Sequence, residues 1–125
     1  MTRKHLICPE KVRRVPKQFS WIDHRLVRDH YIEGLSHAAL ALYLLLATVG
    51  DRKGLSYYSD RSIGSLLAMD LPILTKAREE LIRAGLLAYQ KPLYQVLSLE
   101  PVKTVSSSEL APIASILKQI AGGQA

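Results

Sequence analysis

The apolar residues of this chain are spaced in patterns typical of helices separated by short strands. The stretch 38–47 is apolar on every side, and Ser36, a residue that favours helix N-termini, precedes it. Because a helix without a polar face is typically buried, we expect this helix in the centre of the domain. The glycine-flanked stretch 50–54 then predicts a turn, and the aromatic stretch 55–58 predicts a strand of a few residues.

A second helix is expected directly after Ser59, which is a favourable cap. Its apolar residues Ile63, Leu66 and Leu67 recur at helical spacing, which predicts one buried face. A tight connection at residues 69–71 then leads into a further helix.

The third helix, over residues 72–84, has clear signals at both ends. Pro72 suits a first turn, with Asp70 or Leu71 as the cap, and Gly85 suits the position after the last turn. At about 100° per residue, one side of this helix is apolar and the opposite side is polar. The apolar side comprises Leu74, Ala77, Leu81 and Ala84, and the other side comprises Pro72, Thr75, Lys76, Glu79 and Arg83.

The rest of the chain predicts a hairpin, a linker and a last helix. Two strand-like stretches, 86–90 and 93–99, flank a small tip. Residues 101–108 form a serine-rich linker, and residues 109–121 predict a C-terminal helix. That helix either folds back on the central helix or pairs with its copy in a second chain, and we expect a homodimer. Its apolar stripe comprises Ile113, Ile116, Leu117 and Ile120.

The N-terminal part is expected to contain a basic arm and a less regular segment. Residues 1–18 carry six Lys and Arg and one acidic residue, so they hold +5 of the formal net charge of +6. They are either a solvated tail or an arm that lies along phosphates, with Arg13 and Arg14 as candidate contacts. The apolar stretch 19–22 suggests a short strand or docking segment, and residues 25–32 suggest a short helix.

From Ser36 onward, the order helix, strand, helix, tight turn, helix, hairpin resembles the winged helix–turn–helix family. The stretch 60–67 is similar to the first helix of the family's motif, and the Leu pair after Gly85 is similar to its exit into the wing. The resemblance covers about residues 36–99. Arg78 departs from the pattern, because the family usually has leucine there, which leaves open how deeply the third helix packs or where its register lies. The other matching apolar positions are Leu74, Ala77, Leu81, Leu86 and Leu87.

The resemblance implies a mainly α fold with a small β-hairpin, in the order α-β-α-α-β-β over residues 19–100. It also implies binding of double-stranded DNA by the outer face of the helix at 72–84. In the family the N-terminal part of that face meets base edges, which makes Thr75, Lys76 and Glu79 the candidates. Lys can donate to guanine, Glu can accept from cytosine, and a Thr methyl can touch a thymine methyl. These residues could equally be ordinary solvated residues of an exposed helix.

Candidate phosphate contacts follow from positive charge and from free N–H groups at helix N-termini. The candidates are Arg52, Lys53, Ser59, Arg61, Ser62, Arg83 and Lys91, together with Arg13 and Arg14 in the arm. The hydroxyls of Tyr57 and Tyr58 could also bind phosphate, but we expect these two side chains to pack in the core or the strand.

Composition narrows the class of protein. The net charge of +6 and the pI of about 9.6 favour an anionic partner, with nucleic acid ahead of an acidic membrane surface. Cys8 is the only cysteine, which excludes an intrachain disulfide and a zinc site with two thiolates, and suits the cytoplasm. The histidines are scattered, and no glycine-rich phosphate loop or catalytic triad is evident, so we expect no metal, no cofactor and no enzyme. The apolar-rich run 38–49 is shorter than the roughly 20 residues that span a bilayer.

We therefore expect sequence-specific DNA binding by a small transcriptional regulator, or by an accessory or replication protein of a mobile element. The alternative is a winged-helix module that docks proteins, which is favoured because Ile82 also points outward on the helical wheel. Binding of single-stranded nucleic acid by stacking on tyrosines is a third option. It ranks below the others because the tyrosines form no evident exposed row.

Overall fold

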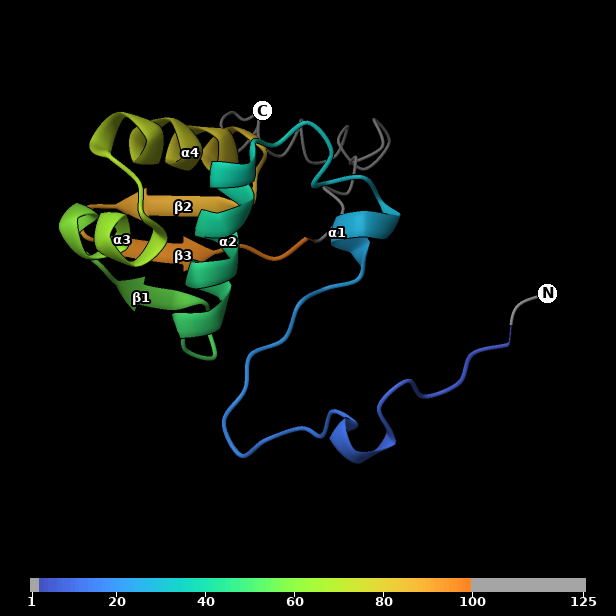
Figure 1. Ribbon diagram of the computed structural model, residues 1–125. Coiled ribbons are helices and arrows are strands. Elements are labelled where there is room, and N and C mark those ends of the chain that lie inside the picture. Colours follow the sequence, from blue (N-terminus) through green and yellow to red (C-terminus); the bar gives the residue numbers. More distant parts are fainter. Residues whose placement is uncertain (1–2, 100–125) are drawn as a thin grey trace, which may run out of the picture.

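The computed structural model of the chain describes residues 3–99 (Figure 1). In this part the elements are η1 (Pro9–Lys11), α1 (Arg25–Arg28), α2 (His37–Val49), β1 (Leu55–Tyr57), α3 (Asp60–Leu67), α4 (Leu71–Arg83), β2 (Leu87–Gln90) and β3 (Leu93–Val96). None of the described helices is long and apolar enough to cross a membrane. The expected linker at 101–108 and the C-terminal helix at 109–121, with Ile113, Ile116, Leu117 and Ile120, lie outside the described residues.

The three longer helices each begin at a side chain that caps the first turn. Ser36 and Ser59 each accept a hydrogen bond from the backbone N–H three residues later, at 3.1 Å, and Asp70 does the same at 3.0 Å. Such caps satisfy N–H groups that have no partner within the helix. Gly85 follows α4 at a φ of +78°, in the left-handed region that favours glycine. The predicted caps are confirmed, with Asp70 rather than Leu71 before α4.

The start of α2 is also tied to the side of α4. The carboxylate of Glu80 accepts a hydrogen bond from the Ser36 backbone N–H at 2.8 Å. This bond stabilises the charged carboxylate, so the pKa of Glu80 is lowered from its usual value. The polar contact therefore fixes the two helices against each other at the end where α2 begins.

The sheet has three antiparallel strands in the order β1-β3-β2. The predicted hairpin is present as β2 and β3, although β3 ends at Val96 and not near residue 99. Strand β1 pairs with the far edge of β3, with Ser56 opposite Tyr94. Because directly paired residues share a face, Tyr57 lies on the other face, and it is exposed. The expectation that Tyr57 packs inside was wrong, whereas Tyr58 does pack against the core.

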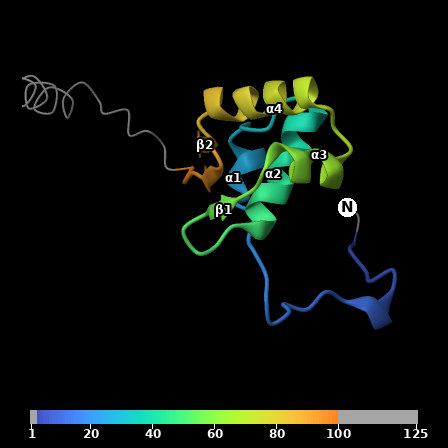
Figure 2. The ribbon, with the colours of Figure 1, turned by 90° about the vertical axis from the view of Figure 1, so that its left-hand side faces the viewer.

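The core lies between the sheet and the helices. Helices α2 and α3 lie on one side of the sheet, and α4 lies across one end of α2 (Figures 1 and 2). Helix α2 is central as predicted, but Leu44, opposite its core side, is 59% exposed. Leu66, expected in the buried face of α3, is 60% exposed. Ile63 is the buried residue of this short helix. The buried side chains are Leu26, Ala39, Leu42, Leu46, Ile63, Leu74, Ala77, Leu81, Leu86, Leu87, Tyr94 and Leu99.

The N-terminal segment joins the folded part through α1 and runs below it in Figure 1. Residues 3–22 are exposed, and the strand suggested for 19–22 is absent from this described segment. Helix α1 is shorter than the predicted 25–32, because His30 adopts a φ of +63°, which ends the helical conformation. The Ser20 hydroxyl donates to the backbone oxygen of Thr48 at 2.9 Å, so the arm is attached beside the end of α2.

Candidate nucleic-acid interface

Helix α4 keeps its apolar side in the core and presents its polar side outward. Leu74, Ala77 and Leu81 are buried, while Lys76 and Glu79 are exposed and Thr75 is half-buried. The predicted orientation is therefore confirmed for these residues, but Ala84, predicted on the apolar side, is exposed because α4 ends at Arg83. The other side chain that sequence analysis placed outward, Ile82, is 44% exposed.

The start of α3 lies next to the tip of the β2–β3 hairpin. The backbone N–H of Tyr58 donates to the backbone oxygen of Pro92 at 3.2 Å. The exposed side chains of Arg61 and Lys91 belong to the two segments joined by this bond. The structure thus brings together the chain segments that precede α3 and form the hairpin tip, although 30 residues separate Arg61 from Lys91 in the chain.

The hydroxyl groups at the start of α3 are already engaged in the cap. The Ser59 hydroxyl accepts from the Ser62 backbone N–H at 3.1 Å and donates to the Ser62 hydroxyl at 3.0 Å. Both residues are exposed, but their side chains serve first to start the helix. Arg61 is therefore the side chain of this turn that extends freely into solvent and supplies positive charge.

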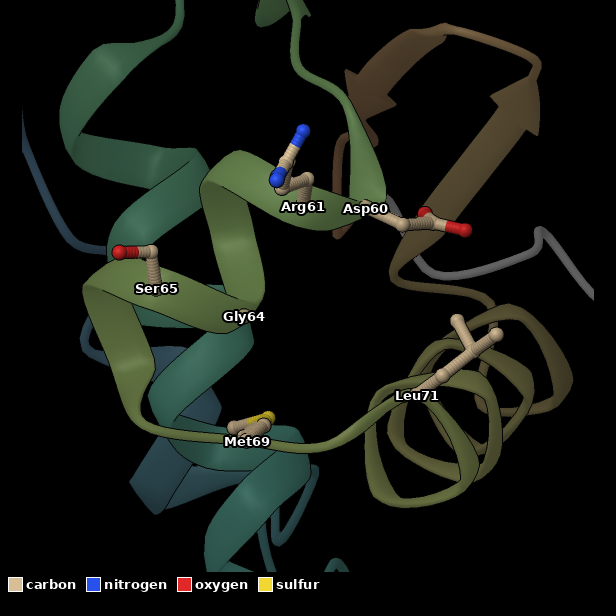
Figure 3. Close-up of a pocket in the computed structure, with 6 residues that line it drawn as sticks. All are labelled: Asp60, Arg61, Gly64, Ser65, Met69 and Leu71. Atoms are coloured by element: carbon tan, nitrogen blue, oxygen red, sulfur yellow. The ribbon is translucent and has the colours of Figure 1, made fainter.

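A groove of about 390 Å³ separates α3 from the start of α4 (Figure 3). Arg61 and Ser65 line it from α3, and Leu71 lines it from α4. The connection can pass close to α3 at Gly64, because a Cβ there would lie 2.8 Å from the backbone oxygen of Met69. The complete lining is Asp60, Arg61, Gly64, Ser65, Met69 and Leu71.

Arg78 joins α3, α4 and the hairpin. Its Nη1 donates to Asp60 Oδ1 and to the Tyr94 hydroxyl, both at 2.8 Å. Its guanidinium lies 4.4 Å from the centre of the Tyr89 ring, which in turn lies 4.5 Å from the Tyr94 ring. Burial disfavours its charge, but the bonds to Asp60 and Tyr94 outweigh that effect, and the pKa of Arg78 is raised.

This cluster explains how α4 accommodates a charged residue at a position where the family that the sequence resembles usually has leucine. Arg78 does not shift the helix; its side chain is 11% exposed and fills the junction of three elements. The cluster could not be predicted from the sequence, because Asp60 and Tyr94 are 18 and 16 residues away from Arg78. The available signal was a single arginine beside the apolar side of α4, opposite an aspartate in the first turn of α3.

The remaining candidate contacts lie away from this junction. Arg52 and Lys53 are exposed in the turn before β1, where the Gly54 oxygen accepts from the Val96 backbone N–H. That turn is at the opposite end of β1 from the hairpin tip. Arg83 is exposed at the last residue of α4, about 18 Å along the helix from its first residue.

Positive charge is divided unevenly between the folded part and the arm. Residues 19–99 carry nine Lys and Arg against eight Asp and Glu, whereas residues 1–18 carry six against one. Arg13 and Arg14 are exposed in the extended arm. Within the folded part, the pairing of Asp60 with Arg78 neutralises an acidic group next to Arg61.

No family model, no curated protein and no solved structure matches this chain. Within residues 3–99, no group of three His, Cys, Asp or Glu side chains could hold a metal ion. What the site can do therefore follows from its exposed helix face, its groove and its basic side chains.

Proposed function

We propose that this chain binds double-stranded DNA as a winged helix–turn–helix protein that recognises sequence through α4. The observation that carries the proposal is the outward polar face of α4 beside the start of α3 and the hairpin tip. The order of elements and the pairing of β1 with the hairpin agree with that family's arrangement, which the sequence resembles. The biological role we propose is a small transcriptional regulator, or an accessory or replication protein of a mobile element.

The dimensions of α4 suit the major groove of B-DNA. Its 13 residues extend for about 20 Å, and a helix with its side chains is about 10–12 Å across. The major groove is about 12 Å wide and admits such a helix. Thr75, Lys76 and Glu79 would then face base edges, while Arg61 and Lys91 would face phosphates.

The arm supplies most of the electrostatic attraction in this proposal. The folded part has a formal net charge of +1, which gives little non-specific affinity for a polyanion, whereas the arm has +5. Arg13 and Arg14, with the other basic residues of the arm, would follow the phosphates. Binding should consequently weaken steeply as salt is added.

The proposal is tested by selecting bound duplexes from a random pool and measuring affinity for the enriched and for scrambled sequences. Lys76→Ala should relax the preference, because a base contact carries sequence information. Arg61→Ala should weaken all duplexes alike, because a phosphate contact does not. Arg28→Ala removes an exposed basic side chain of α1 that is not among the candidate contacts, and serves as the matched control. If no duplex is bound even at low salt, the proposal is wrong.

A second candidate function is docking of a protein partner, and the exposure of Ile82 favours it. An apolar side chain on the outer face of α4 suits a protein surface better than a phosphate-lined groove. A folded chain that shifts no duplex would favour this candidate. Homodimer formation stays a prediction, and a monomeric mass in light scattering at micromolar protein would contradict it.

A further inference from the structure

The first residue of α4 is an exposed leucine at the edge of the groove beside α3. Leu71 is 56% exposed, and its side chain points from the start of α4 toward the first turn of α3 (Figure 3). Thr75 lies one turn later on the same flank of the helix and is half-buried. Leu71 is therefore an exposed apolar side chain beside the polar N-terminal part of the outward face of α4.

Two basic side chains flank Leu71 and Thr75, and the carboxylate of Asp70 beside them is engaged in the cap of α4. Asp60 lines the groove, but its carboxylate is paired with Arg78 at 2.8 Å, so its charge is compensated. Arg61 lines the same groove and is exposed. Lys76 is exposed one residue after Thr75. An exposed leucine beside Arg61 and Lys76 suits a partner that offers apolar groups inside a polyanion.

We propose that Leu71, together with the methyl of Thr75, contacts thymine 5-methyl groups in the major groove. The thymine methyl is the apolar group that base pairs present there, between flanking phosphates that these basic side chains would meet. The chain would then prefer duplexes with thymines where the start of α4 lies. This inference rests on the proposed DNA binding and names the chemical feature that α4 selects.

The test replaces thymine by uracil, which removes only the 5-methyl group. In the duplex selected from the random pool, each thymine facing the start of α4 is replaced in turn by deoxyuridine. The wild-type affinity should fall about fourfold for each methyl in contact, the factor expected for losing one buried methyl-sized group. Uracil outside the selected site should have no effect.

A matched pair of leucine variants assigns the effect to a side chain. Leu71→Ala should bind thymine and uracil duplexes with affinities within twofold of each other, because the methyl has lost its partner. Leu66→Ala removes a leucine of similar exposure that does not line the groove, and it should retain the fourfold preference.

The possible outcomes distinguish failure of the thymine-methyl contact from failure of the proposed DNA binding. If the wild type binds a selected sequence but treats thymine and uracil alike, DNA binding stands and the methyl contact is wrong. A selected site without thymine at these positions, or a Leu71→Ala variant that keeps the preference, also overturns it. If no duplex is bound, both the function and the inference fail.

Discussion

Replacing Arg78 with methionine would remove the charge at the centre of the junction while keeping most of the side-chain volume. The change deletes two hydrogen bonds of 2.8 Å, one to Asp60 and one to Tyr94, and the contact with the Tyr89 ring. Tyr94 is fully buried, so solvent cannot reach its hydroxyl to replace the lost donor. The Asp60 side chain is 33% exposed and can recover hydration.

The hydrogen bonds of Arg78 to Tyr94 and to Asp60 contribute differently to the free energy of unfolding. A hydrogen bond between a charged group and a buried partner contributes about 1.5–3 kcal/mol, which applies to the Tyr94 end. The Asp60 end is partly open to water, so about 0–1 kcal/mol is appropriate there. The ring contact adds about 0.5–1 kcal/mol, and the methionine side chain returns part of the lost packing. We expect a net loss of about 2–3 kcal/mol, or roughly 10–20 °C in Tm.

The assay is urea unfolding followed by far-ultraviolet circular dichroism, with Arg83→Met as the matched control. Arg83 is exposed on the same helix, so its replacement should change stability by less than about 0.5 kcal/mol. Tyr94→Phe should lose less than Arg78→Met, and the double variant should lose less than the sum of the two, because both delete one bond. An Arg78→Met chain as stable as the wild type would refute the structural role of this junction.

Three further predictions concern the arm, a charged hydrogen bond and the turns. Deleting residues 1–18 should reduce the slope of log affinity against log salt by up to about 5, with the preference for the selected duplex retained; an unchanged slope would exclude the arm from phosphate binding. Because the Ser36 N–H lowers the pKa of Glu80, the stability from this pair is complete above the usual 4.5 and is lost as the pH falls through the lower folded value. Glu80→Gln should therefore flatten the acid part of the stability profile measured by urea unfolding, and an unaltered profile would contradict this. Gly54→Ala and Gly85→Ala should each add left-handed backbone strain of about 1–2 kcal/mol. Gly54→Ala should destabilise more in the same assay, because only there does a Cβ lie 2.6 Å from a backbone oxygen of β3. Equal losses of stability would mean that this close contact relaxes freely.

The features that the sequence predicted well are those that depend on neighbouring residues. The caps at Ser36, Ser59 and Asp70 each involve a bond that spans three residues, so their signal is contained in a short window. The left-handed end of α4 at Gly85 is equally local. The orientation of α4 also followed from helical spacing alone, because its core side carries a strong apolar pattern.

The features that the sequence did not predict depend on contacts between distant segments. The pairing of Ser56 with Tyr94 joins residues 38 positions apart, and no local pattern specifies it. The exposure of Leu66 depends on which helices pack beside α3, which spacing within one helix cannot reveal. For the candidate site, the exposed face of α4 was predictable, but the contact of Tyr58 with Pro92 at the hairpin tip required the sheet topology.

The hydrogen bond between Ser20 and Thr48 lies near the boundary between the nearly neutral folded part and the strongly cationic arm. Under the proposed function, capture of DNA from solution and discrimination among sites would then depend on different parts of the chain. The ratio of the affinities for selected and scrambled duplexes should persist at ionic strengths at which the arm no longer binds phosphates. Substitutions in the arm should therefore change how long the chain stays on non-specific DNA without changing which sequence it prefers.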